Sequence, residues 1–435
     1  MGVKLVVVGA GSTYTPELVE GIARRADRLP VDDLVMLDID AARLEIVGGL
    51  ARRMLTKAGW PGLVSLTGDR DRALEGADFV IVQLRVGGNQ ARLLDETIPL
   101  KHGCIGQETT GPGGFMKALR TVPVVLELAE ETARRAANGA WIVDFTNPTG
   151  IVTQALLDEG HRAVGLCNFA INVQLAAAAL FGIDLGRVQL DHVGLNHLSW
   201  VRRILVDGDD RLPDILEAIS GEGDPDLRAR VSEAGVVSVH PPDLIRLLGA
   251  IPSYYLRYYY ATDRALQEQL EGHIRAQEVI EIEAELLERY RDPALDTKPE
   301  LLERRGGAHY SEAAAMLVAS LHDGAADVQV ANVRNDGAIP NLPGDDVVEM
   351  SARISRDGAH PVPTEPLAPE LLGLVQQVKS YERLAIDAST TGSRRRALEA
   401  LMANPLVRQY ELAEALLRDL LEANRAHLPR FFPRG

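Results

Sequence analysis

Two residues with metal-binding side chains lie thirty positions apart in the sequence, Cys167 in VGLCN and His197 in GLNHLSW. Cys167 follows an apolar run that predicts a strand, and open α/β sheets bind their ligands at such strand ends. A thiolate and an imidazole together suit one divalent transition metal, and substrate oxygens can fill its remaining coordination positions. The alternative is that Cys167 is a small core residue and His197 a structural histidine.

The stretch GAGSTYTP near the N-terminus has the residues of a phosphate-binding turn. Gly9 and Gly11 follow the apolar run VKLVVV and precede a stretch with helical spacing. A pyrophosphate can approach the bare backbone of such a turn and bind the N–H groups of the helix start. Ser12 and Thr13 could add hydroxyl and N–H donors. The third glycine of the usual G-x-G-x-x-G pattern is replaced by Tyr14, so the pattern is incomplete.

Asp38, at the end of the second apolar run, fits the same nucleotide site. An acidic side chain at this position accepts hydrogen bonds from the adenosine ribose hydroxyls, which favours NAD over NADP. The glycine turn and Asp38 together predict a dinucleotide site. The alternative is a glycine turn in an α/β domain that binds no nucleotide.

The segment IPSYYLRYYY, residues 251–260, holds five of the ten tyrosines of the chain. It fits either an aromatic helix in the core or an exposed platform for stacking. Pro252 favours a helix that begins near Ser253, and helical spacing would place Tyr255, Tyr258 and Tyr259 on one face. We therefore expect most of these rings to pack in the interior.

The elements that must position these residues alternate between strands and helices in the first part of the chain. Compact apolar runs at 3–8, 33–40, 77–84, 140–148 and 163–168 are separated by stretches with helical spacing. This alternation predicts a parallel, doubly wound α/β sheet of the Rossmann type. We assign residues 1–168 to an NAD-binding domain.

After residue 168 the pattern changes to longer helical stretches with few strand candidates. We assign residues 169–435 to an α+β domain that binds the metal and the substrate. The strand candidates include VQLDHVGLNHLSWVRRILV and DVQVANVRN. The predicted helices span 265–290, 308–323, 369–389 and 394–423.

Composition excludes several classes of protein. With 62 acidic and 46 basic residues the formal charge is −16, and no basic block could follow a nucleic-acid backbone. No segment approaches the roughly 18 continuous apolar residues that a transmembrane helix needs, and the short N-terminal apolar run lacks a cleavage site. Two cysteines are too few for a disulfide framework, so we expect a cytoplasmic protein that binds a small molecule.

Beyond single motifs, a series of segments resembles the signature segments of glycoside hydrolase family 4, in the family's order. These segments are GAGSTYTP, RVGGNQAR, GQETTGPGGF, FTNPTGIV, GLCN, GLNHLSW, SYYLRYYY and NDGAIPNLP. The resemblance implies a nucleotide domain like that of lactate and malate dehydrogenases, a separate substrate domain, and a dimer or tetramer. It also implies a 6-phosphoglycosidase that depends on NAD and Mn²⁺ or another divalent transition metal.

The reaction implied by the resemblance passes through redox steps. NAD+ removes a hydride from C3 of the sugar, and the resulting ketone acidifies the proton on C2. The metal stabilises the developing enediolate while a base removes that proton. The aglycone then leaves C1, water adds, and the NADH returns its hydride to C3.

The resemblance also assigns roles to individual residues. Cys167 and His197 match the two protein ligands of the metal, and Tyr255 matches the catalytic base. A tyrosine with a pKa near 10 needs neighbouring positive charge to act as a base at neutral pH. Lys101 and the metal are the candidates for that charge.

Three residues, Arg85, Asn147 and Arg275, match positions that contact the phosphosugar in the family. A guanidinium can bond two phosphate oxygens at once, which suits Arg275. The alternative for Arg275 is an exposed helix residue paired with Glu271 or Glu278. Two asparagines of NDGAIPNLP, Asn335 and Asn341, fit either substrate contact or structural support.

Asn168, directly after the predicted metal ligand, bears on the linkage that is cleaved. Members that act on α-glucosides tend to have an aspartate there, and members specific for β-glucosides have an asparagine. The resemblance therefore favours a 6-phospho-β-glucosidase, and it leaves the general acid unassigned. Phe169 and Ala170 depart from the family's usual valine and proline, which changes the backbone stiffness beside a ligand.

Other functions fit parts of the sequence. A family member with another substrate, such as an α-glucoside, an α-galactoside or a galacturonide, would keep the same residues. A plain NAD-dependent 2-hydroxyacid dehydrogenase would fit the first domain but would not need Cys167 or Tyr255. A regulator that binds NAD without catalysis would be expected to lose these residues and His197, and all three are present.

Overall fold

The computed structural model describes residues 2–222, 224–234, 239–272, 274–305 and 310–433. Its main feature is a nine-stranded sheet with the strand order β13-β12-β11-β6-β5-β4-β1-β2-β3. The first six strands in sequence pair in parallel and follow the order 3-2-1-4-5-6 of dinucleotide-binding folds, which confirms the predicted doubly wound sheet. They are β1 Val3–Val8, β2 Val31–Leu37, β3 Leu63–Thr67, β4 Phe79–Val82, β5 Trp141–Asp144 and β6 Ala163–Gly165.

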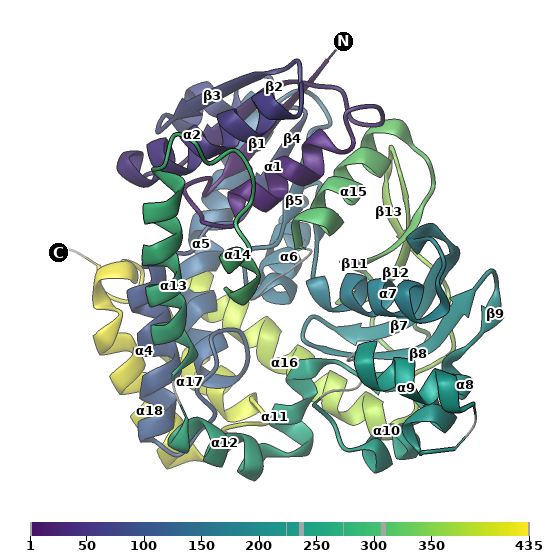
Figure 1. The fold of residues 1–435 in the computed structure, drawn as a ribbon. Coiled ribbons are helices and arrows are strands. Elements are labelled where there is room, and N and C mark those ends of the chain that lie inside the picture. Colours follow the sequence, from purple (N-terminus) through teal and green to yellow (C-terminus); the bar gives the residue numbers. More distant parts are fainter. Residues whose placement is uncertain (1, 223, 235–238, 273, 306–309, 434–435) are drawn as a thin grey trace.

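Helices cover the parallel strands and connect them (Figure 1). Buried apolar side chains of the strands and of these helices form one continuous core, in which Leu5, Val6, Leu34 and Val80 have no exposed surface. Parallel strands are buried on both faces, which explains why their sequences are continuous apolar runs. The helices are α1 Thr15–Ala23, α2 Ala41–Lys57, α3 Arg70–Leu74, α4 Gly88–Lys101, α5 Gly111–Arg135, α6 Thr149–Asp158 and α7 Asn168–Phe181.

The second half of the chain contributes to two sheets. The strand candidate VQLDHVGLNHLSWVRRILV forms a hairpin of a separate sheet, β7 Val188–Leu195 and β8 Leu198–Val206, to which β9 Asp209–Asp210 and β10 Ile251–Pro252 add. DVQVANVRN instead forms β11 Val328–Arg334, which pairs with β6 of the first sheet. With β12 Val347–Ser355 and β13 Gly358–Pro361 it extends that sheet in antiparallel fashion. The division of the chain after residue 168 stays a prediction.

The later helices agree with the predicted stretches except that two predicted helices are each divided. The stretch 265–290 contains α12 Thr262–Glu271 and α13 Arg275–Tyr290, and 394–423 contains α17 Arg394–Ala403 and α18 Tyr410–Ala423. Pro405 follows the end of α17, and the residue before a proline is disfavoured in a helix. The remaining helices are α8 Leu212–Ile219, α9 Pro225–Ala234, α10 Pro242–Leu248, α14 Leu301–Arg304, α15 Tyr310–Asp323 and α16 Pro369–Thr391.

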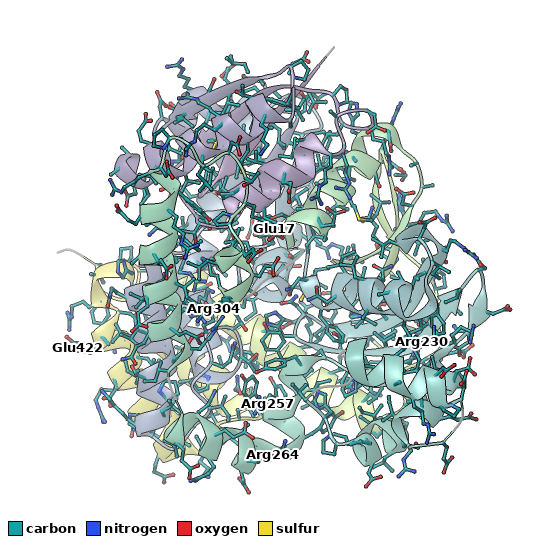
Figure 2. All side chains as sticks on the ribbon, viewed as in Figure 1. Glu17, Arg230, Arg257, Arg264, Arg304 and Glu422 are labelled. Carbon is teal, nitrogen blue, oxygen red and sulfur yellow. The ribbon has the colours of Figure 1, made fainter. Side chains whose placement is uncertain are left out.

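The tyrosine segment is not the continuous helix predicted from Ser253. Ile251 and Pro252 pair with β8, residues Tyr254–Leu256 form a 3₁₀ turn, and Arg257–Tyr260 form the single turn α11. Arg257, labelled in Figure 2, lies over the Tyr254 ring at 5.6 Å from its centre. This change of helix type within a few residues lets neighbouring tyrosines point in different directions.

Charged side chains are spread over the exterior of the whole molecule (Figure 2). Among the residues that the structure describes, no helix is both long enough and apolar enough to span a bilayer.

Candidate active site

The structure brings Cys167, His197 and Tyr255 together. Cys167 precedes helix α7 at the carboxyl end of β6, and it is 4% exposed. His197 occupies the turn between β7 and β8, with a left-handed φ of 63°. The rings of His197 and Tyr255 stack with their centres 3.7 Å apart and their planes inclined by 18°. Burial is the largest cause that raises the pKa of the Tyr255 phenol, and Cys167 lies close enough to raise it further.

His197 has the properties of an available metal ligand. Its imidazole is buried, and neither ring nitrogen has a hydrogen-bond partner among the described residues. Burial lowers the pKa of His197 to about 4, so the ring is neutral at pH 7 and can offer a lone pair. Buried polar atoms without partners are rare in proteins and call for a ligand or a water. The residues therefore fit a divalent metal.

A metal held by Cys167 and His197 alone would have open coordination positions. Within the described part of the chain, no group of three or more His, Cys, Asp and Glu side chains could hold a metal ion. A metal on Cys167 and His197 would therefore need oxygen ligands from elsewhere. Open positions are typical of catalytic metal sites, whereas structural sites are closed by protein ligands.

A buried carboxylate, Glu349 of β12, fixes the turn that carries His197. The Asn196 amide donates to Glu349 Oε2 (2.7 Å), the Ser199 hydroxyl donates to Oε1 (3.1 Å), and His192 Nε2 lies 3.0 Å from Oε1. Burial raises the pKa of Glu349, but these hydrogen bonds outweigh burial and keep the pKa below its usual value. An ionised Glu349 thus ties β7, β8 and the turn between them to the large sheet. Nothing in the sequence signalled it, because it lies about 150 residues from its partners.

The environment of Tyr255 does not make it a base without help. Burial raises the pKa of Tyr255 well above its usual value near 10, and Cys167, Tyr258 and Glu108 raise it further. Tyr254 meets it edge to face, with the ring centres 5.5 Å apart. The neighbouring rings therefore fix the direction of the phenol, while its ionisation requires positive charge in the site.

Three cations surround the carboxylate of Glu108, whose side chain is 13% exposed, next to these residues. Lys117 Nζ lies 2.7 Å from Glu108 Oε2, Arg92 Nη1 lies 3.2 Å from Oε1, and Arg85 donates to Oε2. Burial would raise the pKa of Glu108, but the three cations hold it well below its usual range. Arg92 also pairs with Glu96, at 2.7 Å. Of this cluster, the sequence pointed only to Arg85.

Lys101 is not placed where the sequence interpretation needed it. It ends helix α4 and is exposed, whereas a charge that acts strongly on buried Tyr255 must itself lie in the interior. Lys117 is the buried lysine of this region, with 3% of its surface exposed, and its charge reaches His197. The structure therefore corrects Lys101 to Lys117 as the lysine beside the site.

The other predicted substrate residues differ in their surroundings. Asn147, after β5, has a buried Oδ1 without a hydrogen-bond partner among the described residues, as expected of a group that awaits a ligand. Asn168 is the first residue of α7, next to Cys167. Arg275 begins α13, donates to the Arg304 carbonyl (2.8 Å) and pairs with Glu278. Its side chain is 40% exposed, so the pairing foreseen as the alternative is present.

Two further asparagines support the backbone. Asn335 is fully buried and donates to the carbonyls of Ile339 and Leu342, both at 3.0 Å. The Asn341 amide exchanges two hydrogen bonds with the backbone of Leu367. Their side chains are occupied by the protein, which favours structural support over substrate contact.

The nucleotide turn has the expected geometry. Gly9 has a φ of +83°, and a Cβ there would lie 2.9 Å from the Gln83 carbonyl oxygen. The Gly11 N–H donates to Asp38 Oδ2 (2.8 Å), and a Cβ on Gly11 would meet the same oxygen at 2.9 Å. Both glycines are thus required for close approach between β1, β2 and β4.

The hydroxyls of the turn face the protein. Ser12 Oγ accepts from the Tyr14 N–H (3.2 Å), and the Thr13 hydroxyl donates to Glu283 (3.3 Å). The backbone N–H groups of Gly9, Ala10, Gly11 and Ser12 also donate to acceptors within the protein, so phosphate binding by this turn stays a prediction. Ile39, which follows Asp38, is 97% exposed, as expected of an apolar side chain that an adenine ring would cover.

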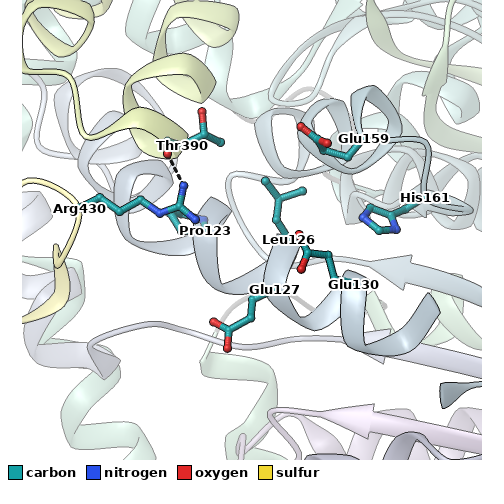
Figure 3. Close-up of a pocket in the computed structure, with 8 residues that line it drawn as sticks. All are labelled: Pro123, Leu126, Glu127, Glu130, Glu159, His161, Thr390 and Arg430. Atoms are coloured by element: carbon teal, nitrogen blue, oxygen red, sulfur yellow. Dashed lines mark hydrogen bonds between the residues drawn. The ribbon is translucent and has the colours of Figure 1, made fainter. Parts of the chain in front are cut away.

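Two hollows differ in their relation to this site. A cavity of about 20 Å³ adjoins His197 and is lined also by Thr109, Asn196, Tyr259 and Glu382, which is room for a water molecule. A larger hollow of about 340 Å³ contains none of the predicted site residues (Figure 3). It is lined by Pro123, Leu126, Glu127, Glu130, Glu159, His161, Thr390 and Arg430.

Comparison with protein families gives two matches that together cover most of the chain. Residues 4–183 match the model of family 4 glycosyl hydrolases, and residues 192–407 match the model of the C-terminal domain of the same family.

Full-length relatives agree with the family match. A probable 6-phospho-β-glucosidase of Bacillus subtilis is 44% identical, with 99% of this chain and 98% of that protein covered. A 6-phospho-β-glucosidase of Escherichia coli is 37% identical, over 98% of this chain and 96% of that one. A phospho-α-glucosidase of Clostridium acetobutylicum is 31% identical, over 97% and 98%.

Solved structures with the same fold include bound cofactors. The 6-phospho-β-glucosidase of Thermotoga maritima, solved with manganese, NAD+ and glucose-6-phosphate, matches with a TM-score of 0.90 and 36% identity over 98% of this chain and 99% of that one. A lactate dehydrogenase from a deep-sea metagenome matches with a TM-score of 0.53 and 14% identity, over 90% of this chain and all of that one. This second likeness concerns the fold alone and confirms the dehydrogenase-like architecture.

Proposed function

This chain belongs to family 4 of the glycosyl hydrolases, and from that premise we propose that it hydrolyses 6-phospho-β-glucosides with NAD and a divalent metal such as Mn²⁺. The observation that carries the proposal is the stacking of buried His197 on partly buried Tyr255, with ring centres 3.7 Å apart beside Cys167. A ligand pair and a potential base share one site at the strand ends of a dinucleotide-binding sheet.

The residues divide the work of the reaction among them. When bound, NAD+ accepts a hydride from C3 of the sugar and returns it at the end, and the metal withdraws electron density from the C2 and C3 oxygens. Cys167 Sγ and an imidazole nitrogen of His197 hold the metal. Tyr255 takes the proton from C2 at its phenolic oxygen, and the stacked His197 ring holds the phenol in one orientation. The aglycone then leaves C1, and water replaces it.

The cluster of Arg85, Arg92 and Lys117 supplies positive charge for a phosphorylated sugar. These three cations face two carboxylates, Glu108 and Glu96, so the cluster carries one net positive charge when Lys117 is protonated. A phosphate group is attracted to such a site, and a guanidinium can bond two of its oxygens. We assign Arg85 and the unpartnered Oδ1 of Asn147 to the substrate, and Arg275 to a supporting position at the start of α13.

Two observations support a β-linked substrate. Asn168 occupies the position in which members that act on α-glucosides tend to have an aspartate. The relatives with 37% and 44% identity are named 6-phospho-β-glucosidases, while a phospho-α-glucosidase has 31%. The residue after Cys167 is an asparagine, and its amide is not an acid. Another group must therefore protonate the leaving oxygen.

The test is a paired assay in D₂O. The enzyme receives NAD+, Mn²⁺ and a thiol reductant, and is offered nitrophenyl glucosides with α or β linkage, each with and without the 6-phosphate. We expect turnover of the phosphorylated β-glucoside and deuterium at C2 of its product. Turnover without NAD+, or a product without the label, would refute the redox route.

Matched cysteine variants test the metal assignment. Cys167→Ser should lose Mn²⁺ binding and activity together, whereas Cys104→Ser should keep both, because Cys104 is a buried core residue. A fully active Cys167→Ser enzyme would end the ligand assignment. We also propose a homo-oligomer, a dimer or tetramer, and a cytoplasmic location; sedimentation of the purified enzyme tests the former and cell fractionation the latter.

A further inference from the structure

One carboxylate, Glu283 of α13, joins four separate parts of the chain beside the nucleotide turn. Its Oε2 accepts from Arg43 Nη2 (3.1 Å) and from Asn89 Nδ2 (2.8 Å). Its Oε1 accepts from Arg305 Nη2 (2.5 Å) and from the Thr13 hydroxyl (3.3 Å). Glu283 is 5% exposed. Three of its four partners belong to the first 90 residues of the chain, whereas Arg305 directly follows α14.

Arg43 lies next to the predicted ribose site. A Cβ on Gly11 would be 2.9 Å from Asp38 Oδ2 and 3.2 Å from Arg43 Cβ, so Asp38 and Arg43 border the same glycine. Arg43 stands in the first turn of α2, where the Asp40 side chain accepts from its backbone N–H (3.0 Å). In dinucleotide-binding sheets, an acidic residue at the position of Asp38 binds the ribose hydroxyls of NAD, and an arginine nearby accommodates the 2′-phosphate of NADP.

In this structure the guanidinium of Arg43 is directed elsewhere. Its Nε donates to the Gly11 carbonyl (3.2 Å), and its Nη2 donates to Glu283. The Arg43 side chain is 33% exposed and the Glu283 side chain, taken without its backbone, is 7% exposed, so the pair is partly shielded from solvent. Burial raises the pKa of Glu283, but Arg305 and Arg43 outweigh it and lower the pKa to about 2. The carboxylate is therefore ionised at neutral pH and holds both arginines.

We propose that Glu283 determines cofactor specificity by holding Arg43 away from the ribose 2′-position. Asp38 alone repels a 2′-phosphate, yet Arg43 is close enough to compensate if it were released. Glu283 prevents Arg43 from offsetting the repulsion of the 2′-phosphate, because it holds the guanidinium through an ion pair and a hydrogen bond. The specificity for NAD over NADP then depends on a residue of α13, about 240 positions after Arg43 in sequence. The inference rests on the proposed function only in that the cofactor is a nicotinamide dinucleotide.

The test measures dissociation constants of NAD+ and NADP+ for the purified full-length enzyme by calorimetry. In Glu283→Gln, the affinity ratio of NADP+ to NAD+ should rise about tenfold, the effect of one charge-assisted contact. In Glu283→Gln with Arg43→Leu, the ratio should return to its wild-type value. Glu281→Gln, an exposed residue of the same helix, serves as the matched control and should leave the ratio unchanged.

A second measurement does not depend on the stability of Glu283→Gln. Arg43→Leu in the otherwise unchanged enzyme should not alter the ratio, because Arg43 is held by Glu283 and not by cofactor. A fall in the relative affinity for NADP+ in Arg43→Leu would overturn the inference, as would an unchanged ratio in folded Glu283→Gln. If the wild-type enzyme bound neither dinucleotide, the proposed function itself would fail.

Discussion

Lys117 offers a direct test of the site, because the burial of its charge should destabilise the fold while the charge itself serves function. Its side chain is 4% exposed, and its Nζ lies 2.7 Å from Glu108 Oε2. Burial and the neighbouring Arg85 together lower the pKa of Lys117 from 10.5 to about 7, because Glu108 only partly opposes them. In Lys117→Met the long apolar stem remains, and Glu108 keeps Arg85 and Arg92 as partners. We therefore expect a variant that folds well and loses activity.

The magnitude follows from the linkage between protonation and folding. The unfolded lysine binds its proton up to pH 10.5, and the folded one releases it near pH 7, so the wild-type free energy of unfolding rises with pH between these values. The slope approaches about 1.4 kcal/mol per pH unit. Between pH 7.5 and 9 the wild type should therefore gain about 2 kcal/mol relative to Lys117→Met, in which the titrating amine is absent.

The assay is urea unfolding of both proteins at several pH values between 7 and 9.5, read as the difference in unfolding free energy. Other titrating groups are common to both proteins and cancel in the difference. Lys57→Met, which removes an exposed lysine paired with Asp296, serves as the matched control for the loss of a surface lysine. The kcat/KM of Lys117→Met should fall tenfold or more, as expected when a charged contact is lost. A flat difference for Lys117→Met, with full activity, would refute the reasoning.

Further variants test other parts of the site. Gly194→Ala would bring a Cβ within 2.3 Å of the Leu198 oxygen at a φ of +135°, so it should cost at least about 1–3 kcal/mol and weaken Mn²⁺ binding in a titration. Gly373→Ala, at an open position of α16, should instead stabilise by about 1 kcal/mol in the same unfolding assay. Arg120→Met would leave the fully buried carboxylate of Asp95 without its arginine and should cost about 3–5 kcal/mol on denaturant unfolding. Lys101→Ala should keep kcat/KM within about twofold, because the side chain is exposed, and a large loss would restore Lys101 to the site.

Local patterns predicted the fold well where one element carries its own signal. The run VKLVVV is strand β1 at the predicted bounds, since a strand buried on both faces must be apolar throughout. Strand β3, Leu63–Thr67, was missed because it forms the edge of the sheet and is only partly buried. DVQVANVRN was recognised as a strand, but its pairing with β6 follows from tertiary packing that no local pattern records.

Those residues of the candidate site that stand in segments resembling the family's signatures could be predicted from the sequence. Cys167, His197 and Tyr255 are of this kind, and the structure brings them together. Lys101 was a candidate for the positive charge near Tyr255, and no local pattern indicated whether its side chain is buried. Glu283 could not be found from the sequence, because it is one of several glutamates of α13 and a glutamate in a helix usually marks a solvated face.

The buried charged residues share a physical property that bears on function. Glu108 and Lys117 occupy interior positions in which ionised side chains are expensive, and packing alone would be served better by apolar residues of similar volume. Where a protein keeps such groups, their cost is expected to be offset by what they bind or orient. Glu108 holds Arg85 and Arg92 in fixed positions before any ligand arrives, so a phosphorylated sugar would meet donors that are already oriented. The same carboxylate raises the pKa of Tyr255. Glu108 therefore orients the arginines for a phosphate but makes it harder for Tyr255 to ionise and act as a base. A bound phosphate would add further negative charge to this cluster and would not lower the pKa of Tyr255, so the positive charge that the base needs must come from another group in the site, such as the metal.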